Sequence, residues 1–194
     1  MNTLEKRITD YLSRNLRHSK FRHSLGVAKM SELLANKHGA SASKAYIAGL
    51  LHDCGRTIPV KKYYTYVKKH SIKLGPFKKL YFSNPFLLHG IIGRHVAGSK
   101  FKIKAIGVLD SISAHTVAKR SMSKLGKIVY LADMIAPDRR YAGVKMLRKK
   151  SFNDLNDAMI FALKIKLSKV LNSQRQIFPE TVFLWNELNK KSNH

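Results

Sequence analysis

Apolar residues recur at helical spacing through most of the chain, and runs that alternate apolar with polar residues are scarce. In the segment 21–38, Val27, Met30 and Leu34 share one face of a helix, because residues three and four apart lie on the same side. This helix is expected to stop at Gly39, since glycine readily adopts the left-handed conformation that ends many helices. The pattern therefore predicts an all-α fold.

Capping residues and prolines place the other helices along the chain. The first twelve residues have the polar spacing of an amphipathic helix. Ser41 or Ser43 is expected to open a helix that ends near Asp53. Gly90 and Gly93 flank one turn of a later helix and could allow a neighbouring helix to approach closely. Further helices are predicted after Asn84-Pro85, over 102–115, over 124–136 before Pro137, after a capping box of Ser151 and Asp154, and from Pro179 through Trp185.

No repeat, low-complexity tract or long linker divides the 194 residues. We therefore expect one domain over 1–194, with a core at about 18–140 and C-terminal helices at about 151–190 packed on it. No apolar run approaches the roughly 20 residues that would cross a bilayer, and the first residues do not form a signal peptide. The one cysteine, Cys54, excludes an internal disulfide and is expected to be a small buried residue. These features predict a soluble cytoplasmic protein without membrane contacts.

The chain is strongly basic: 37 lysines and arginines against 11 acids give a formal net charge of +26. A surplus of this size attracts polyanions, although a Lys-rich composition throughout the source organism would produce the same charge. Between Gly55 and Ser83, basic and aromatic residues alternate, which is typical of surfaces that bind nucleotides or nucleic acid. We favour the simpler interpretation, a surface helix whose tyrosines pack on the core. The charge thus indicates an anionic ligand without naming it.

Histidines and aspartates occur inside several otherwise apolar helical segments. A lone histidine on an apolar face usually has only a structural role, but buried polar groups are normally paired, and too few acids lie nearby to pair four histidines. Imidazoles suit borderline transition metals, and carboxylates can bridge two ions. Such a two-metal site would make hydroxide from water at neutral pH and stabilise both oxygens of a displacement at phosphorus. The six candidate ligands are His23, His52, Asp53, His89, His115 and Asp133.

The order of these residues and the segments around them resemble the HD-domain phosphohydrolases. Within them, the chain is similar to the YqeK family of symmetrical bis(5′-nucleosyl)-tetraphosphatases. The HD pair is general to the superfamily, whereas LLHG and YLAD followed by P-x-R are specific. The matching segments, from about Phe21 to Ile165, are RHSLGVAKMSELLA, AGLLHDCGR, NPFLLHG, AHTVAKRSMSKLGKIVYLADMIAPDRR, YAGVKMLRKK and DLNDAM.

The resemblance implies an all-helical HD domain with two divalent metal ions, iron in the first place and manganese as the alternative. It implies hydrolysis of diadenosine tetraphosphate to two ADP through a hydroxide activated by both metals. Asp53 would bridge the two ions. The primary site would consist of His23, His52, Asp53 and Asp133, and the second ion would be held by Asp53, His89 and His115.

Basic residues would bind the substrate's phosphates. The resemblance implies a catalytic role for Arg56 as well as for Asp53, and phosphate contacts from Arg56, Lys119 and Arg139. Two departures affect these positions. Ala136 stands where the family has a glutamate before the proline, and Lys119 stands where it tends to have an arginine, which removes bidentate geometry.

Two alternatives stay open. One is hydrolysis of another nucleotide, such as a monophosphate or a cyclic dinucleotide, because an HD site specifies phosphate esters more firmly than bases. The other is a nucleic-acid- or ribosome-associated binding protein, which the net charge of +26 motivates. The expected partner is a dinucleoside polyphosphate substrate. Nucleic acid at the basic surface and a homodimer are left open, and a membrane is not expected.

Overall fold

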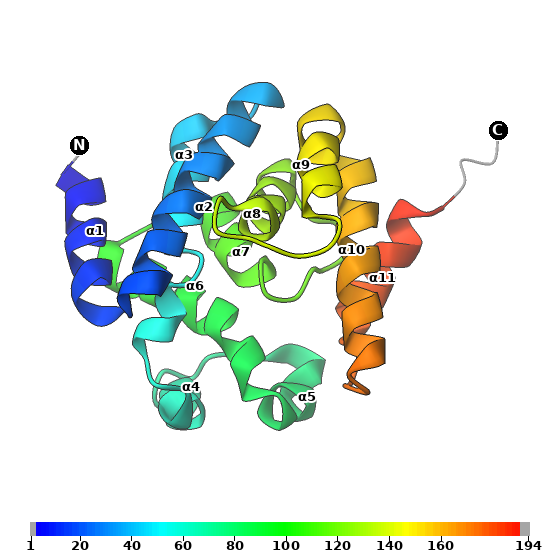
Figure 1. The fold of residues 1–194 in the computed structure, drawn as a ribbon. Helices are drawn as coiled ribbons and strands as arrows, with labels where there is room; N and C mark the ends of the chain where they lie inside the picture. Colours follow the sequence, from blue (N-terminus) through cyan, green and yellow to red (C-terminus); the bar gives the residue numbers. More distant parts are fainter. Residues whose placement is uncertain (1–2, 191–194) are drawn as a thin grey trace.

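The computed structural model describes residues 3–190, and it contains helices and no strand in that range, which confirms the all-α prediction (Figure 1). Met1 and Asn2 of the predicted first helix lie outside the described residues. No helix between residues 3 and 190 combines the length and the apolar character that crossing a membrane requires. The helices are α1 (Thr3–Asn15), α2 (His18–Lys37), α3 (Ala42–Leu51), α4 (Tyr63–Lys69), α5 (Lys78–Ser83), α6 (Leu88–Phe101), α7 (Ile106–Ala114), α8 (Lys124–Ile135), α9 (Val144–Asn153), α10 (Leu155–Asn172) and α11 (Pro179–Leu188).

Local capping fixes the junction between α2 and α3. Gly39, just beyond α2, has a φ of +62°, as the sequence predicts for a helix end. Of the two candidate serines, Ser41 is the N-cap of α3, and its hydroxyl accepts a hydrogen bond from the amide of Lys44 at 3.4 Å. The helix ends at Leu51. The HD pair therefore lies in the turn that leaves α3.

Asn84 holds the N-cap position of the helical turn that Pro85 opens, as predicted, but its side chain makes no capping hydrogen bond. Its side-chain amide donates instead to the carbonyl of Leu80 at 3.2 Å and to Gln176 Oε1 at 3.0 Å. Pro85 opens a short 3-10 turn, Pro85–Leu87, and α6 begins only after it. A proline at the first position suits either kind of helix, so the sequence signal does not distinguish them.

The predicted capping box of Ser151 and Asp154 is wrong. Ser151 lies inside α9, where its hydroxyl donates to the carbonyl of Leu147 at 2.8 Å. Asp154 alone caps α10, because its carboxylate accepts from the amide of Asp157 at 2.7 Å. Basic residues interrupt the apolar pattern of α9, whose buried stripe is narrow and includes Val144 and Leu147. The pattern therefore does not predict this helix.

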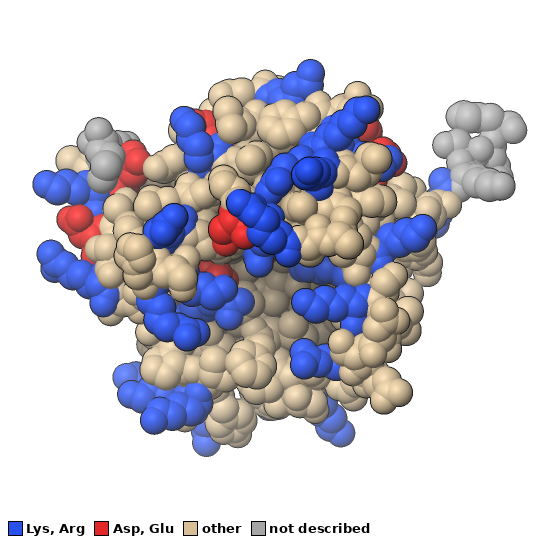
Figure 2. All heavy atoms as spheres, viewed as in Figure 1, with Lys and Arg blue, Asp and Glu red and all other residues tan. Residues whose placement is uncertain are grey.

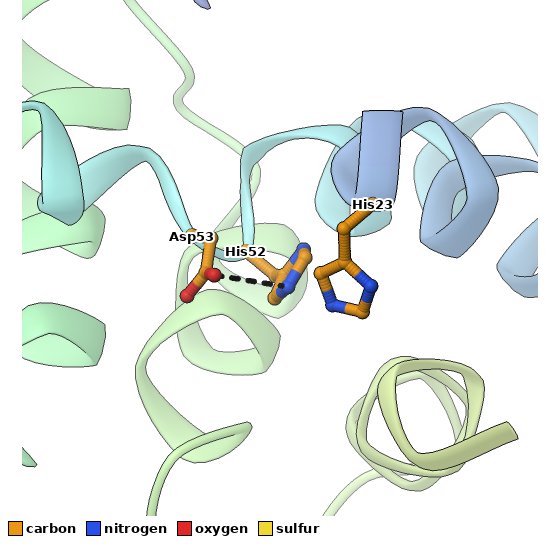
Figure 3. A group of neighbouring side chains, drawn as sticks. All are labelled: His23, His52 and Asp53. Atoms are coloured by element: carbon orange, nitrogen blue, oxygen red, sulfur yellow. Dashed lines mark ion pairs between the residues drawn. The ribbon is translucent and has the colours of Figure 1, made fainter. Parts of the chain in front are cut away.

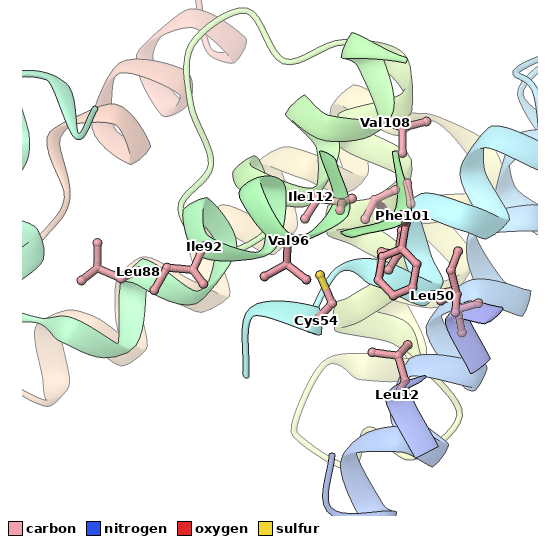
Figure 4. Close-up of a cluster of buried hydrophobic side chains, with 14 of the residues drawn as sticks. Leu12, Leu50, Cys54, Leu88, Ile92, Val96, Phe101, Val108 and Ile112 are labelled. Atoms are coloured by element: carbon pink, nitrogen blue, oxygen red, sulfur yellow. The ribbon is translucent and has the colours of Figure 1, made fainter. Parts of the chain in front are cut away.

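Two groups of buried side chains form the interior. The first joins α1, α3, α6 and α7, and Figure 4 shows part of it, with Cys54 among Leu50, Val96 and Ile112. Cys54 is fully buried, as expected, and its thiol donates to the carbonyl of Gly93 at 3.3 Å. The second group joins α2, α8, α10 and α11. Both groups hold the central helices α2, α3, α6, α7 and α8 against one another.

Two close approaches place α6 within this interior. A Cβ at Gly90 would lie 2.5 Å from Thr116 Oγ1 and 2.8 Å from the carbonyl oxygen of Ser113. The end of α7 and the residues just after it therefore pack directly against this glycine. A Cβ at Gly55 would lie 2.1 Å from the carbonyl oxygen of His89 and 2.7 Å from the amide nitrogen of Gly93. The turn Cys54–Thr57, which follows the HD pair, therefore lies in backbone contact with α6.

The basic and aromatic segment forms α4, α5 and the turns between them, at the lower edge of Figure 1. Tyr63 and Tyr81 are buried there, which agrees with the favoured interpretation of tyrosines packed on the core. Tyr64 is 57% exposed and does not fit it. The segment thus has both a packed side and an open side.

Candidate metal centre

Side chains from five parts of the chain converge at one point. Because α2, α3, α6, α7 and α8 pack together, the late turn of α8 faces the early turns of α2 and α6. The four histidines and Asp53 are at most 5% exposed, and the Asp133 side chain is 15% exposed. Figure 3 shows His23 beside His52, with Asp53 on the other side of His52. The contributing positions are His23 in α2, His52 and Asp53 after α3, His89 in α6, His115 after α7 and Asp133 in α8.

The imidazoles share one arrangement of ring nitrogens. Nδ1 of His52 faces the carbonyl of Gly49 at 2.7 Å, and Nδ1 of His115 faces that of Ile112 at 2.6 Å. Nδ1 of His89 likewise faces a backbone carbonyl, three residues earlier. A carbonyl only accepts, so this geometry assigns the proton to Nδ1 in each ring and leaves a lone pair on Nε2. The three Nε2 atoms all point into the cluster.

His23 is oriented by a carboxylate instead. Its Nδ1 lies 2.9 Å from both oxygens of Asp138, and its Nε2 lies 2.9 Å from Asp133 Oδ1. The sequence pattern does not single out Asp138, whose only signal is that an acid follows Asp133 five residues later. Histidines that bind metals commonly donate their outer N–H to a carboxylate or a carbonyl. All four rings have that support.

Asp53 lies where the two halves of the cluster meet. Its Oδ1 is 3.2 Å from Nε2 of His89 and 3.6 Å from Nε2 of His115. Its Oδ2 is 3.8 Å from Nε2 of His52. Two sets of donor atoms therefore include Asp53, one with His23 and His52 and one with His89 and His115, and within each set all ligand atoms lie within 4.8 Å of one another.

The donor set fits two divalent cations. Nε2 of His89 and Nε2 of His115 lie 3.1 Å apart, yet neither has a proton to donate if both Nδ1 atoms bond carbonyls. Nε2 of His52 is buried and has no hydrogen-bond partner among residues 3–190. A cation bound by these lone pairs would satisfy both groups, and Asp53 has an oxygen for each ion.

The electrostatics favour the metal-binding forms of four of these groups, His52, His115, Asp53 and Asp133. His23 is the exception: burial would lower its pKa, but hydrogen bonds to Asp133 and Asp138 outweigh burial and raise it. Burial lowers the pKa of His52 to about 4 and also lowers the pKa of His115, so both rings are neutral at neutral pH. Burial alone would raise the pKa of Asp53, but the adjacent imidazoles outweigh it and hold this pKa well below its usual value. The same balance, with a hydrogen bond from His23, holds down the pKa of Asp133. Neutral imidazoles and ionised carboxylates are the species that coordinate metals.

Two arginines contact this cluster from its open side. Arg56 Nε donates to Asp53 Oδ1 at 2.6 Å, and its Nη2 lies 3.1 Å from Nε2 of His89. Arg139 pairs with the carboxylate of Asp133, and its Nε donates to the backbone carbonyl of the same residue at 2.8 Å. The arginine side chains are 31% and 36% exposed, so each can also meet an anion from solvent.

Lys119 lies elsewhere. Its Nζ is 3.9 Å from Asp110, which also pairs with Arg94, and the side chain lines a separate cavity with Phe77 and Phe178. A further cation lies near the cluster: the Nζ of Lys20 is 3.9 Å from Asp53 Oδ2. Its position at the start of α2, three residues before His23, is the only sequence signal.

Comparisons with known proteins agree with this geometry. The family model described as "HD domain" matches residues 21–138. A symmetrical bis(5′-nucleosyl)-tetraphosphatase of Bacillus subtilis is 28% identical over 177 residues, which cover 91% of this chain and 93% of that protein. A protein of the same description from Halalkalibacterium halodurans is 30% identical over 174 residues, with 90% and 91% covered. A crystal structure of a predicted HD superfamily hydrolase involved in NAD metabolism, from Clostridium acetobutylicum, has a TM-score of 0.89 and 35% identity, and 95% and 96% of the two chains are covered.

Proposed function

Because the chain belongs to the HD-domain family of metal-dependent hydrolases, we propose that it cleaves diadenosine tetraphosphate symmetrically into two ADP. The observation that carries this proposal is the pair of buried donor sets that share Asp53. A centre of this kind suits phosphate esters and anhydrides. The named activity of relatives that align over nine-tenths of the chain supports the tetraphosphate in particular.

In this proposal His23, His52, Asp53 and Asp133 hold one divalent ion, and Asp53, His89 and His115 hold the other. Bound there, the two ions would supply an acidified water and positive charge at the reacting phosphate. Iron, with manganese as the alternative, is part of the proposal. Nucleic-acid binding, a homodimer and a cytoplasmic location stay predictions from the sequence.

The chain's own residues orient the reactants. Asp138 accepts a hydrogen bond from Nδ1 of His23 and so orients the ring with Nε2 towards Asp133 in the donor set, where a bound ion would replace the proton on Nε2. Arg56 pairs with Asp53, and Arg139 pairs with Asp133. Each guanidinium can donate two parallel hydrogen bonds to the oxygens of one phosphate. Together they would hold the two central phosphates in register with the carboxylates beneath them.

Product identity tests the proposal. Protein purified without oxygen and loaded with Fe²⁺ or Mn²⁺ should convert diadenosine tetraphosphate into ADP alone, as measured by chromatography. ATP together with AMP would contradict symmetrical cleavage. Turnover of a nucleoside monophosphate or a cyclic dinucleotide, with the tetraphosphate left intact, would favour the neighbouring activity in the same family.

Replacing Arg56 by glutamine is expected to lower kcat/KM by about 100-fold, because a hydrogen bond to a charged group is worth up to about 3 kcal/mol. Metal content should stay at the wild-type level, since Arg56 donates hydrogen bonds and is not a ligand. Arg120→Gln is the control, because Arg120 stacks over Phe183, away from the centre. Equal kcat/KM in wild type and Arg56→Gln would remove Arg56 from the phosphate-binding role.

A further inference from the structure

A cavity of about 350 Å³ opens beside the candidate metal centre. It lies between the end of α8, the segment that follows α8, and α10. Asp133 belongs both to this cavity and to the donor cluster, so the two share a wall. The other lining residues are Met134, Arg139, Tyr141, Ala142, Ile165, Lys166 and Lys169.

The positive charge in this cavity has few counter-charges. The ammonium of Lys166 lies 4.3 Å from the centroid of the Tyr130 ring, and within residues 3–190 no carboxylate lies within ion-pair distance of it. Lys169 follows three positions later and therefore shares this face of α10. Asp133 is the one acid among the described lining residues, and it already pairs with Arg139. Lys166 thus feels the charge of Asp133 without forming an ion pair with it, which leaves the half-buried ammonium able to bind an external anion.

The rest of the wall is apolar and fixed in place. The hydroxyl of Tyr141 donates to the carbonyl of Met134 at 2.9 Å, which holds the ring at the cavity edge. Ile165 and Ala142 add aliphatic surface. Figure 2 shows that this side of the molecule is hollowed at its centre and that lysines and arginines gather on both sides of the hollow. Small-molecule sites commonly combine apolar walls with a few convergent polar groups, and here those groups are cations that suit a nucleoside phosphate.

We propose that this cavity holds one nucleoside diphosphate arm of the substrate, with Lys166 and Lys169 binding the phosphate attached to the ribose. The proposal rests on the proposed function and makes it more specific. Symmetrical cleavage places the two central phosphates of the substrate at the donor cluster. The outer phosphate of each arm, which is attached to the ribose, must then lie next to a central phosphate and outside the cluster. On the Asp133 side, that direction leads to Arg139 and then to the lysines of α10. The lysines would thus select an arm of two phosphates.

Lysine-to-methionine variants test this subsite, because methionine keeps the unbranched stem and removes the charge. In the metal-loaded protein, Lys166→Met and Lys169→Met should each weaken ADP binding about tenfold, as measured by calorimetry. Binding of inorganic phosphate should stay unchanged, since phosphate alone can sit at the metal ions. For diadenosine tetraphosphate, KM should rise while kcat stays within twofold, because the outer phosphate does not react.

Lys164→Met is the matched control, since Lys164 lies on the same helix, is exposed and does not line the cavity. Lys166→Arg should restore most of the affinity for ADP. If the double variant Lys166→Met/Lys169→Met binds ADP as tightly as wild type does, the subsite is overturned, whereas symmetrical cleavage by wild type would still stand. An equal loss of affinity for ADP and for inorganic phosphate would also overturn the subsite. That result would show that the lysines act only through the overall positive charge of the protein, and not through contact with one phosphate of ADP. If wild type makes no ADP from the tetraphosphate but the double variant still loses ADP affinity, the proposed function falls and the subsite holds.

Discussion

Asp53→Asn is expected to abolish most turnover while the protein stays folded. The asparagine keeps the shape of the side chain but offers one neutral oxygen in place of a carboxylate that serves both donor sets. Loss of about 4 kcal/mol of stabilisation at the reacting phosphate corresponds to roughly a 1,000-fold fall in kcat. Elemental analysis should show that metal content falls in parallel, and circular dichroism should show wild-type helicity.

Asp110→Asn is the control for this experiment. Asp110 also pairs with two cations, Arg94 and Lys119, but it is partly exposed and lies outside the donor cluster. Its variant should retain metal and activity. If Asp53→Asn keeps two metal ions per chain and normal turnover, Asp53 does not bridge the centre, and the assignment of both donor sets fails.

Among replacements of a glycine by alanine in this chain, Gly55→Ala is expected to lower stability the most. The new Cβ would lie 2.1 Å from the carbonyl oxygen of His89 and 2.7 Å from the amide of Gly93, both of which are backbone atoms of α6. Because backbone cannot rotate away as a side chain can, α6 must move, and His89 moves with it. Overpacking of this kind costs about 3 kcal/mol, and for a chain of this size that lowers Tm by roughly 10 °C.

Gly98→Ala, in α6 itself, is expected to have the opposite effect on stability. A Cβ at Gly98 meets nothing closer than 3.9 Å, so the methyl group fits and the helix gains about 0.5 kcal/mol from the higher propensity of alanine. Thermal unfolding and metal analysis of both variants distinguish the two effects. A Gly55→Ala protein with wild-type Tm and wild-type metal content would show that the turn after the HD pair does not support His89.

The sequence predicts the helices of this centre well, because each candidate ligand lies in or directly after an apolar segment, and serine caps begin α3 and α8. It predicts neither the direction of the ring nitrogens nor the support of His23 by Asp138, since a 53% exposed acid after a proline carries no buried pattern. Lys166 shows the same limit. In LKIKLSK it looks like one more solvated charge, and only the packing of α10 against α8 brings it over Tyr130.

Lys119 is the opposite case, a residue that the sequence places at the phosphate-binding site and that pairs elsewhere in the structure. A basic residue four positions after His115 matches a family position in the sequence, yet the Nζ of Lys119 lies 3.9 Å from Asp110, which is outside the donor cluster. The turn that follows α7 directs the two side chains apart. Spacing along the chain predicts proximity only within a regular helix, and α7 ends at Ala114, just before His115.

The distribution of the donors also bears on how the molecule is made. His23 and Asp133, whose side chains lie 2.9 Å apart, are separated by 110 positions in the chain. During synthesis, four histidines and one carboxylate therefore leave the ribosome before the last donor does. A nascent chain stalled ahead of α8 would expose imidazoles to free metal without Asp133, the carboxylate that completes the primary donor set. The complete centre can therefore form only in a chain that has been translated past Asp133.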